Sequence, residues 1–228
     1  MLELIDVSFS YGDGWALKNI NLKIEENSFV LVVGANGSGK TTLFKLLAGL
    51  LPLQSGFIRL NGKDLKEIDL KKICCYVFHN PFDQIIGSTV EEDIAFGLEN
   101  LGLSRDQIRA RVQKTLESFQ LDERRHDDPF TLSGGTAQKL AVASLYALQP
   151  EIFLLDEPTS MLDDEGVYEI LKALEELKKM GKTILISTHE PKIFFNLATQ
   201  IIHMRRGSVD FFGSLEDFLE ERFEDVEC

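Results

Sequence analysis

Three short apolar runs, each followed at once by polar residues, stand out along the chain. They cover residues 29–33, 152–155 and 183–186. The runs are nearly continuous rather than alternating, which is typical of parallel strands that are covered on both faces. Because open α/β sheets bind ligands at the carboxyl ends of their strands, the polar residues after these runs are expected to meet at one site.

The pattern changes on either side of the first run. Residues 2–24 alternate between apolar and polar positions and are predicted to form antiparallel strands. Residues 57–60 and 74–78 are predicted to be two further strands. From about residue 81 to residue 148 apolar positions recur at helical spacing, which predicts a helical subdomain inserted into the α/β core.

Two amphipathic helices are predicted in the last third of the chain. Asp164 can cap the first of them, and Gly181 ends it. The second is acidic and covers about residues 214–228, and packing on its own domain is favoured over a partner contact. The predicted fold is therefore one α/β domain over residues 1–228, with a mixed sheet around a phosphate loop, an antiparallel β subdomain and the helical insertion.

Composition narrows the class of protein. With 44% hydrophobic and 27% charged residues, the 228-residue chain has the composition of an ordinary soluble globular protein. It has no apolar run long enough to span a membrane and no signal-peptide layout at its start. The net charge of −13 argues against a nucleic-acid partner. The three cysteines suit neither a disulfide framework nor a metal site, which fits a reducing cytoplasm.

A phosphate-loop motif follows the first apolar run. Residues 34–42 have the form G-x-x-x-x-G-K-[ST] between a predicted strand and a predicted helix. Backbone N–H groups of such a loop surround a phosphate, Lys40 is expected to reach the β- and γ-phosphates of ATP, and the Thr41 hydroxyl is expected to hold Mg²⁺. The candidate binding residues of this loop are Asn36, Gly37, Ser38, Gly39, Lys40, Thr41 and Thr42.

The ends of the other two runs carry candidate catalytic groups. Asp156 is expected to support the Mg²⁺ coordination sphere, and Glu157 to polarise a water for attack on the γ-phosphate. His189 follows the third run and is expected to contact the γ-phosphate or that water. Tyr11, shortly before the loop, could stack on adenine, although packing is the commoner role of an aromatic residue in a strand-rich stretch.

A second phosphate-binding surface is predicted at residues 132–135, L-S-G-G. Ser133 is a natural N-cap for the helix that follows, and Gly134 and Gly135 expose N–H groups at its positive end. The alternative is that these residues only cap the helix.

The order of these motifs resembles the ATPase domain of ABC transporters. The phosphate loop, L-S-G-G, Asp156-Glu157, S-M-L-D at 160–163 and His189 follow one another as in that family, over essentially the whole chain. The resemblance implies that Tyr11 stacks on adenine. It also implies that two ATPase domains pack head to tail, with Ser133, Gly134 and Gly135 acting on the ATP of the other subunit and with the 160–163 loop at their interface.

Within that family, residues 77–84 and 90–100 resemble the energy-coupling factor (ECF) ATPases and the related cobalt and nickel importer ATPases. This implies ATP hydrolysis coupled to vitamin or transition-metal uptake at the cytoplasmic face of the membrane. The implied partners are a transmembrane coupling subunit, whose helices enter a charged groove from Asp83 to Asp93, and a substrate-binding membrane subunit. Two alternatives are a soluble ABC ATPase acting on ribosomes or DNA and a nucleotide-dependent interaction module that does not hydrolyse ATP.

Two residues depart from the family pattern. His79 stands where the family usually has a glutamine that touches Mg²⁺ and the attacking water. His79 is therefore a candidate metal residue beside Thr41 and Asp156, because imidazole can coordinate a metal, although it is a poor match for Mg²⁺, which prefers oxygen ligands. Thr136 replaces the glutamine that usually follows L-S-G-G. These departures favour a heterodimer with a second ABC ATPase subunit over a homodimer.

Overall fold

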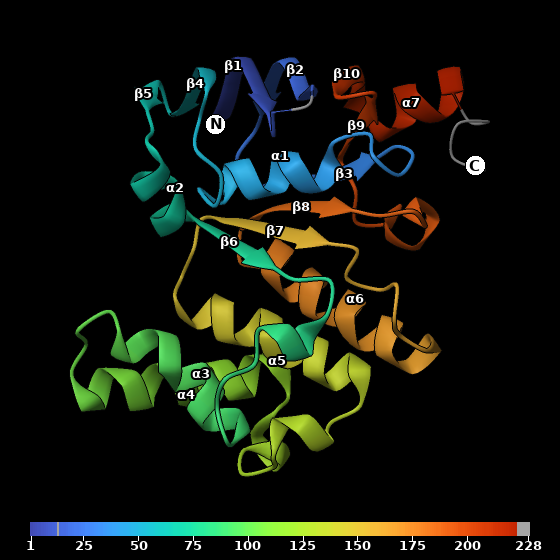
Figure 1. Cartoon of the computed structure of the whole chain (residues 1–228). Coiled ribbons are helices and arrows are strands. Elements are labelled where there is room, and N and C mark those ends of the chain that lie inside the picture. Colours follow the sequence, from blue (N-terminus) through green and yellow to red (C-terminus); the bar gives the residue numbers. More distant parts are fainter. Residues whose placement is uncertain (13, 223–228) are drawn as a thin grey trace. The chain divides into compact units, whose positions relative to one another are not determined.

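The computed structural model describes residues 1–12 and 14–222 and divides the chain into two compact units (Figure 1). The first unit comprises Met1–Tyr76, Glu151–Glu157 and Lys178–Cys228, and the second Val77–Pro150 and Pro158–Leu177. The helical insertion predicted at about 81–148 lies within the second unit, which also takes in most of the helix after Pro158. No helix within the described residues is both long and apolar enough to cross a membrane.

A six-stranded sheet forms the base of the first unit. Its strands follow the order β10-β9-β3-β8-β7-β6. Their bounds are Phe29–Val33 (β3), Cys74–Val77 (β6), Ile152–Asp156 (β7), Thr183–Ser187 (β8), Gln200–Arg205 (β9) and Ser208–Ser214 (β10). Strands β7, β8, β3 and β9 are parallel, whereas β10 runs antiparallel to β9. The three apolar runs are β3, β7 and β8, and every residue of these strands is buried, so the predicted mixed sheet is confirmed.

An antiparallel sheet and a helix complete the first unit. The sheet has the order β2-β1-β4-β5, with bounds Leu2–Ser10 (β1), Trp15–Ile24 (β2), Ser55–Leu60 (β4) and Lys63–Asp64 (β5). Helix α1 (Lys40–Leu47) lies between this sheet and the six-stranded sheet (Figure 1). One buried cluster joins Leu4 of β1, Phe44 of α1 and Val32 of β3. The start of α1, where the phosphate loop ends, is therefore held by the core.

The second unit is helical. Its helices are α3 (Val90–Glu99), α4 (Arg105–Phe119), α5 (Gly134–Ala147) and the greater part of α6 (Asp164–Lys179). The predicted capping box of α4 is confirmed, because the Ser104 hydroxyl accepts from the Gln107 N–H and the Gln107 side chain accepts from the Ser104 N–H. Short turns of 3₁₀ helix cover Pro81–Asp83, Asp122–Arg124 and Pro129–Thr131. Asp164 is the first residue of α6 rather than its cap.

Two short helices and a 3₁₀ turn complete the described residues of the first unit. Helix α2 (Glu67–Ile73) precedes β6, the 3₁₀ turn Pro191–Phe194 follows β8, and α7 (Leu215–Arg222) follows β10. Phe218 of α7 is fully buried, with its ring centroid 5.2 Å from that of Phe211 and 5.9 Å from that of His203. This part of the predicted acidic helix packs on its own unit, and residues 223–228 lie outside the described residues.

Candidate functional site

The phosphate loop joins β3 to α1 in the first unit. Gly39 precedes α1 with a φ of 111°, and a Cβ there would lie 2.9 Å from the Ala16 carbonyl oxygen. Only glycine fits a backbone of that conformation at such a close approach. The residues that line the adjoining cavity of about 230 Å³ come from four segments of the first unit: Ala16, Asn36–Thr42, Asp156 and Glu157, and His189. The structure thus brings the loop together with the ends of β7 and β8.

Lys40 is the buried cation of this cavity. Its Nζ donates a hydrogen bond of 2.7 Å to the Gly34 carbonyl oxygen. Burial lowers the pKa of the Lys40 ammonium, whereas the negative charges of Glu157 and Asp156 act to raise it. A cation beside a helix N-terminus and a loop of N–H donors is an arrangement that binds phosphate groups.

Asp156, the last residue of β7, is held by hydroxyl groups from both neighbouring strands. The Tyr76 hydroxyl on β6 donates 2.7 Å to Asp156 Oδ2, and the Ser187 hydroxyl on β8 donates to Oδ1. Burial and the adjacent Asp156 raise the pKa of the Tyr76 phenol, which keeps it a donor. Sequence analysis missed both hydroxyls, because only the strand order β8-β7-β6 puts them beside Asp156.

Glu157 and His189 contact one another directly. Glu157 Oε1 lies 3.2 Å from His189 Nε2, and the backbone N–H of His189 donates a 3.2 Å hydrogen bond to Glu157 Oε2. The backbone of Glu157 has a φ of 52°, a left-handed conformation that is uncommon for a residue other than glycine and that clusters at functional sites. The two side chains expected to act on the attacking water therefore lie in contact, and the Glu157 carboxylate is hydrogen-bonded to the backbone of His189.

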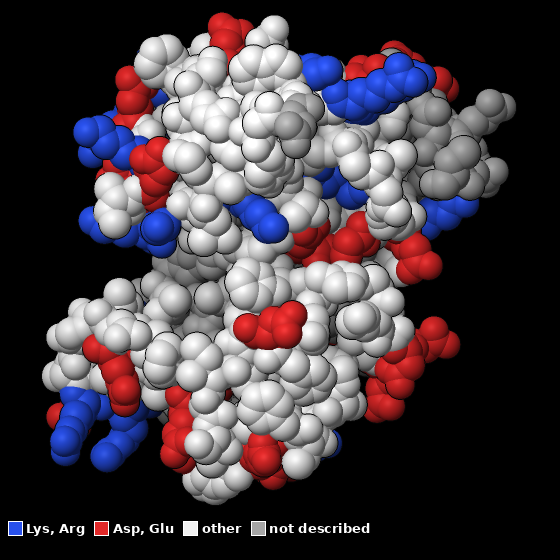
Figure 2. All heavy atoms as spheres, in the orientation of Figure 1, with Lys and Arg blue, Asp and Glu red and all other residues white. Residues whose placement is uncertain are grey.

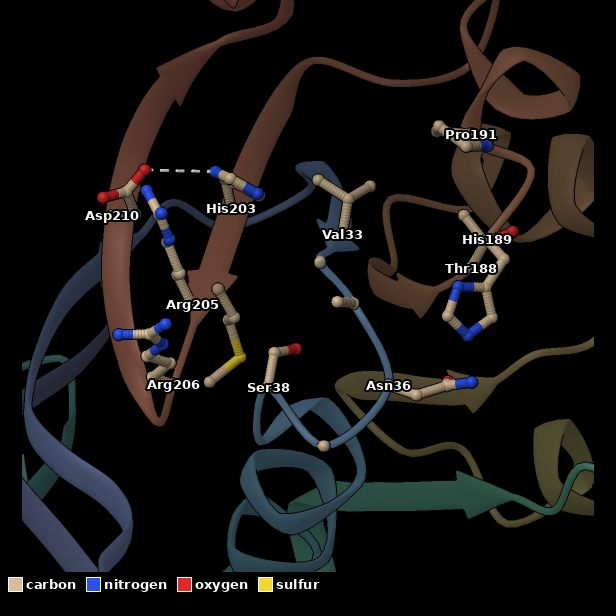
Figure 3. Close-up of a pocket in the computed structure, with 14 residues that line it drawn as sticks. Val33, Asn36, Ser38, Thr188, His189, Pro191, His203, Arg205, Arg206 and Asp210 are labelled. Atoms are coloured by element: carbon tan, nitrogen blue, oxygen red, sulfur yellow. Dashed lines mark ion pairs between the residues drawn. The ribbon is translucent and has the colours of Figure 1, made fainter. Parts of the chain in front are cut away.

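A larger cavity of about 620 Å³ lies beside the same loop (Figure 3). Asn36 and His189 lie on one side of the view, and Arg205 and Arg206 of the β9–β10 hairpin on the other. His203 Nδ1 lies 3.3 Å from an Asp210 carboxylate oxygen on its wall. Sequence analysis did not place this hairpin at the site, because the hairpin carries no motif and reaches the loop only through the pairing of β9 with β3.

Tyr11 lies at the end of β1 with its side chain in the open. It is 63% exposed, and its hydroxyl lies 3.5 Å from the Thr42 Oγ1 of the phosphate loop. Its ring meets Phe9 edge-on at a centroid distance of 4.9 Å. An exposed aromatic ring beside the loop is placed where a base could stack on it, and core packing alone does not account for its exposure.

The L-S-G-G segment lies in the second unit, at the start of α5. The Ser133 hydroxyl accepts a bond of 3.3 Å from the Thr136 N–H, so the predicted N-cap is confirmed. A Cβ on Gly135 would lie 2.3 Å from the Gly166 Cα, so Gly135 also has a packing role between α5 and α6. A Cβ on Gly134 would meet nothing closer than 3.4 Å, at Leu162 Cδ2.

His79 also belongs to the second unit. Its Nδ1 lies 3.1 Å from the Ser160 hydroxyl oxygen, and Ser160 begins the S-M-L-D loop. Within the part of the chain that the structure describes, no three His, Cys, Asp or Glu side chains are grouped to hold a metal by themselves. In enzymes that bind nucleotides, Mg²⁺ is usually held by one or two protein oxygens together with phosphate oxygens of the substrate. Thr41 and Asp156 could supply the protein oxygens.

One residue of the expected charged groove from Asp83 to Asp93 is buried. Asp93 is 7% exposed and accepts bonds of 2.8 and 3.0 Å from the N–H groups of Ile86 and Gly87 and of 2.6 Å from the Ser144 hydroxyl. These hydrogen bonds hold the loop before α3 against α5, so the Asp93 side chain itself is not accessible to a partner helix.

On the face that Figure 2 shows, the basic side chains of the described residues lie in small groups among acidic ones.

Comparison with known proteins gives concordant matches. Residues 17–160 match the family model described as ABC transporter. The chain is 46% identical over 226 residues to the energy-coupling factor transporter ATP-binding protein EcfA1 of Thermotoga maritima, which covers 99% of the chain and 86% of the relative.

Two solved structures share the fold. One is cbiO1 from Clostridium perfringens, described as part of the ABC transporter complex cbiONQ, with a TM-score of 0.89, 32% identity and coverage of 97% of this chain and 91% of that chain. The other is a dimeric post-hydrolysis state of the ATP-binding cassette MJ0796 bound to ADP and Pi, with a TM-score of 0.79, 29% identity and coverage of 94% and 99%. The predicted fold class is confirmed, and the family match together with the near full-length relative shows that this chain belongs to the ATPases of ABC transporters.

Proposed function

We propose that this chain hydrolyses ATP to drive a membrane importer of the energy-coupling factor type. The observation that carries the proposal is the meeting of Lys40, Asp156 and the Glu157–His189 pair around one cavity beside the phosphate loop. The similarity to EcfA1, a named transporter subunit, supports the link to transport. In this proposal the substrate, a vitamin or a transition metal, is chosen by membrane subunits rather than by this chain.

The first unit supplies the groups that bind ATP. Loop N–H groups and Lys40 bind the phosphates, and the exposed Tyr11 ring stacks on adenine. Thr41 and Asp156 would hold Mg²⁺, since they offer the oxygen ligands that this ion prefers. Bound Mg²⁺ supplies positive charge to the β- and γ-phosphates. The Tyr76 and Ser187 hydroxyls orient the Asp156 carboxylate toward that role.

The Glu157–His189 pair handles the attacking water. Glu157 accepts a hydrogen bond from the water and so orients a lone pair of the water oxygen toward the γ-phosphate. His189 contacts the γ-phosphate and orients the Glu157 carboxylate through their mutual contact. Proton transfer and electrostatic stabilisation then come from groups that the ends of β7 and β8 hold in place.

Ser133, Gly134 and Gly135 act on ATP held by a second ABC ATPase subunit packed head to tail. The N-terminus of α5 carries positive dipole and N–H donors suited to a γ-phosphate. His79 and Thr136 depart from the usual residues, which favours a heterodimer whose other subunit carries the standard ones. The dimer lies at the cytoplasmic face of the membrane, bound to a transmembrane coupling subunit and a substrate-binding subunit.

The test of hydrolysis compares the purified chain with Glu157→Gln. Loss of the general base is expected to lower the ATP turnover by about 100-fold or more, while ATP binding persists. Turnover that survives in Glu157→Gln would contradict the role of Glu157.

The test of partnership is purification from membranes through a tag on this chain. We expect a second ATPase subunit and membrane proteins to co-purify, and turnover of the assembled complex to exceed the sum of the separate subunits. Recovery with ribosomes or DNA, and none with membranes, would overturn the importer proposal. Equal turnover for the chain alone would overturn the heterodimer.

A further inference from the structure

Hydrogen bonds connect three side chains of the second unit in series, those of Ser133, Thr136 and Glu169. The Ser133 hydroxyl lies 2.9 Å from the Thr136 hydroxyl, and the Thr136 hydroxyl lies 3.1 Å from Glu169 Oε2 of α6. Thr136 is only 5% exposed, whereas Ser133 is exposed at the start of α5. Ser133 therefore faces solvent, whereas Thr136 is shielded from it and Glu169 is partly exposed.

The direction of these hydrogen bonds follows from the chemistry of their members. An ionised carboxylate only accepts, so Thr136 must give its single hydroxyl proton to Glu169. Thr136 Oγ1 can then only accept from Ser133. Lys139 Nζ lies 3.5 Å from the other oxygen of Glu169, so a cation also contacts the carboxylate.

The Ser133 hydroxyl is left without a proton to offer outward. Its own proton points to Thr136, and one of its two lone pairs accepts from the Thr136 N–H at 3.3 Å. The remaining lone pair is what an approaching ligand meets. A phosphate oxygen is repelled by a lone pair and attracted by an O–H donor, so this orientation opposes phosphate binding.

We propose that Thr136 and Glu169 form a relay that turns the Ser133 proton away from nucleotide and so weakens the hold of α5 on a triphosphate. The inference rests on the proposed role of Ser133 toward the ATP of the second subunit. Thr136 is a positioning residue here, because it acts through Ser133. A glutamine at this position, as in the family pattern, could donate an amide N–H to Glu169 without taking the Ser133 proton.

The helix cap and the relay can be separated by mutation. The cap is the backbone bond from the Thr136 N–H to Ser133, and Thr136→Val keeps it. Valine has nearly the shape of threonine but no hydroxyl, so it breaks only the relay. Thr136→Ser keeps the hydroxyl and is the matched control.

The test uses the transporter complex purified through a tag on this chain, titrated with ATP. In Thr136→Val the concentration that half-saturates hydrolysis is expected to fall by about fivefold, the size of one net hydrogen bond. Thr136→Ser should stay at the value of the natural chain. ATP-dependent association of the two ATPase subunits should tighten by a similar factor in Thr136→Val, which gives a readout apart from turnover.

A double variant shows whether the effect passes through Ser133. In a Ser133→Ala background, Thr136→Val should no longer change the ATP dependence. An unchanged or higher half-saturating concentration in Thr136→Val, with Ser133→Ala still weakening ATP use in the Thr136→Val background, would overturn the relay alone. If Ser133→Ala left the ATP dependence of Thr136→Val unchanged, the proposed role of Ser133 would fail and the relay with it.

Discussion

The carboxylate of Asp156 illustrates how single hydroxyls set the geometry of the site. Tyr76 and Ser187 each donate to a different oxygen of Asp156, so its plane is held from both sides. Partners of this kind around a metal-binding residue raise metal affinity by restricting the orientation of the ligand. The proposed Mg²⁺ site therefore depends on residues from three adjacent strands.

Removing the Tyr76 hydroxyl tests this arrangement. We expect Tyr76→Phe to raise the Mg²⁺ concentration needed for half-maximal ATP hydrolysis by about tenfold, because one oxygen of Asp156 loses its donor. Mn²⁺ binding, followed by its paramagnetic resonance in the presence of ATP, should weaken in parallel. Tyr146→Phe, a partly buried tyrosine of the second unit, is the control. An equal shift in both variants would contradict the assignment.

The buried cysteines give a second prediction at the residue scale. Burial raises the pKa of the Cys74 thiol to about 12 and that of Cys75 well above its ordinary value. Both thiols stay protonated at pH 8, so a maleimide should leave them unlabelled in the folded Cys228→Ser variant and label them in denaturant. Labelling at the same rate in both states would contradict their burial.

The same shifts have a consequence for stability. A thiol whose folded-state pKa is raised binds its proton more tightly in the folded state. Its contribution is therefore complete below the unfolded pKa of about 8.5 and is lost as the pH rises toward the folded value. The melting temperature is therefore expected to fall as the pH is raised above about 8.5.

Among the elements, the contact between α5 and α6 assigns different roles to two adjacent glycines. A Cβ at Gly135 would lie 2.3 Å from the Gly166 Cα, but a Cβ at Gly134 would make ordinary contacts. Gly135→Ala is expected to destabilise the second unit by about 1–3 kcal/mol, because the backbones must move apart.

Gly134→Ala is the matched control for that substitution. It should melt at nearly the temperature of the natural chain and should affect only ATP use, since its side chain would stand at the proposed phosphate surface. Calorimetry distinguishes the two variants. Equal melting temperatures would show that α5 and α6 do not pack as described.

For the whole molecule, ATP is expected to stabilise the folded chain. A ligand present at about 100 times its dissociation constant adds about 2.7 kcal/mol to the free energy of unfolding. The melting temperature should therefore rise with ATP, and Lys40→Ala should abolish most of that rise. Lys45→Ala, in the last turn of the same helix, should keep it. A full rise in Lys40→Ala would contradict the role of Lys40.

The sequence by itself determined the fold class, the phosphate loop and the polar ends of β7 and β8. These features depend on local signals, namely continuous apolar runs, glycine spacing and capping residues such as Ser104 and Ser133. Such signals survive without knowledge of distant contacts, because strand burial and helix capping act within a few residues.

Tertiary structure alone decided which distant groups meet. The strand order placed Tyr76 and Ser187 beside Asp156, the pairing of β9 with β3 brought the Arg205–Arg206 turn to the phosphate loop, and helix packing joined Thr136 to Glu169. Helix packing also buries Asp93, which was expected on an exposed groove, and brings its carboxylate to the Ser144 hydroxyl of α5. A charged or hydroxyl side chain carries no local pattern that names its partner, because that partner is chosen by how strands and helices pack.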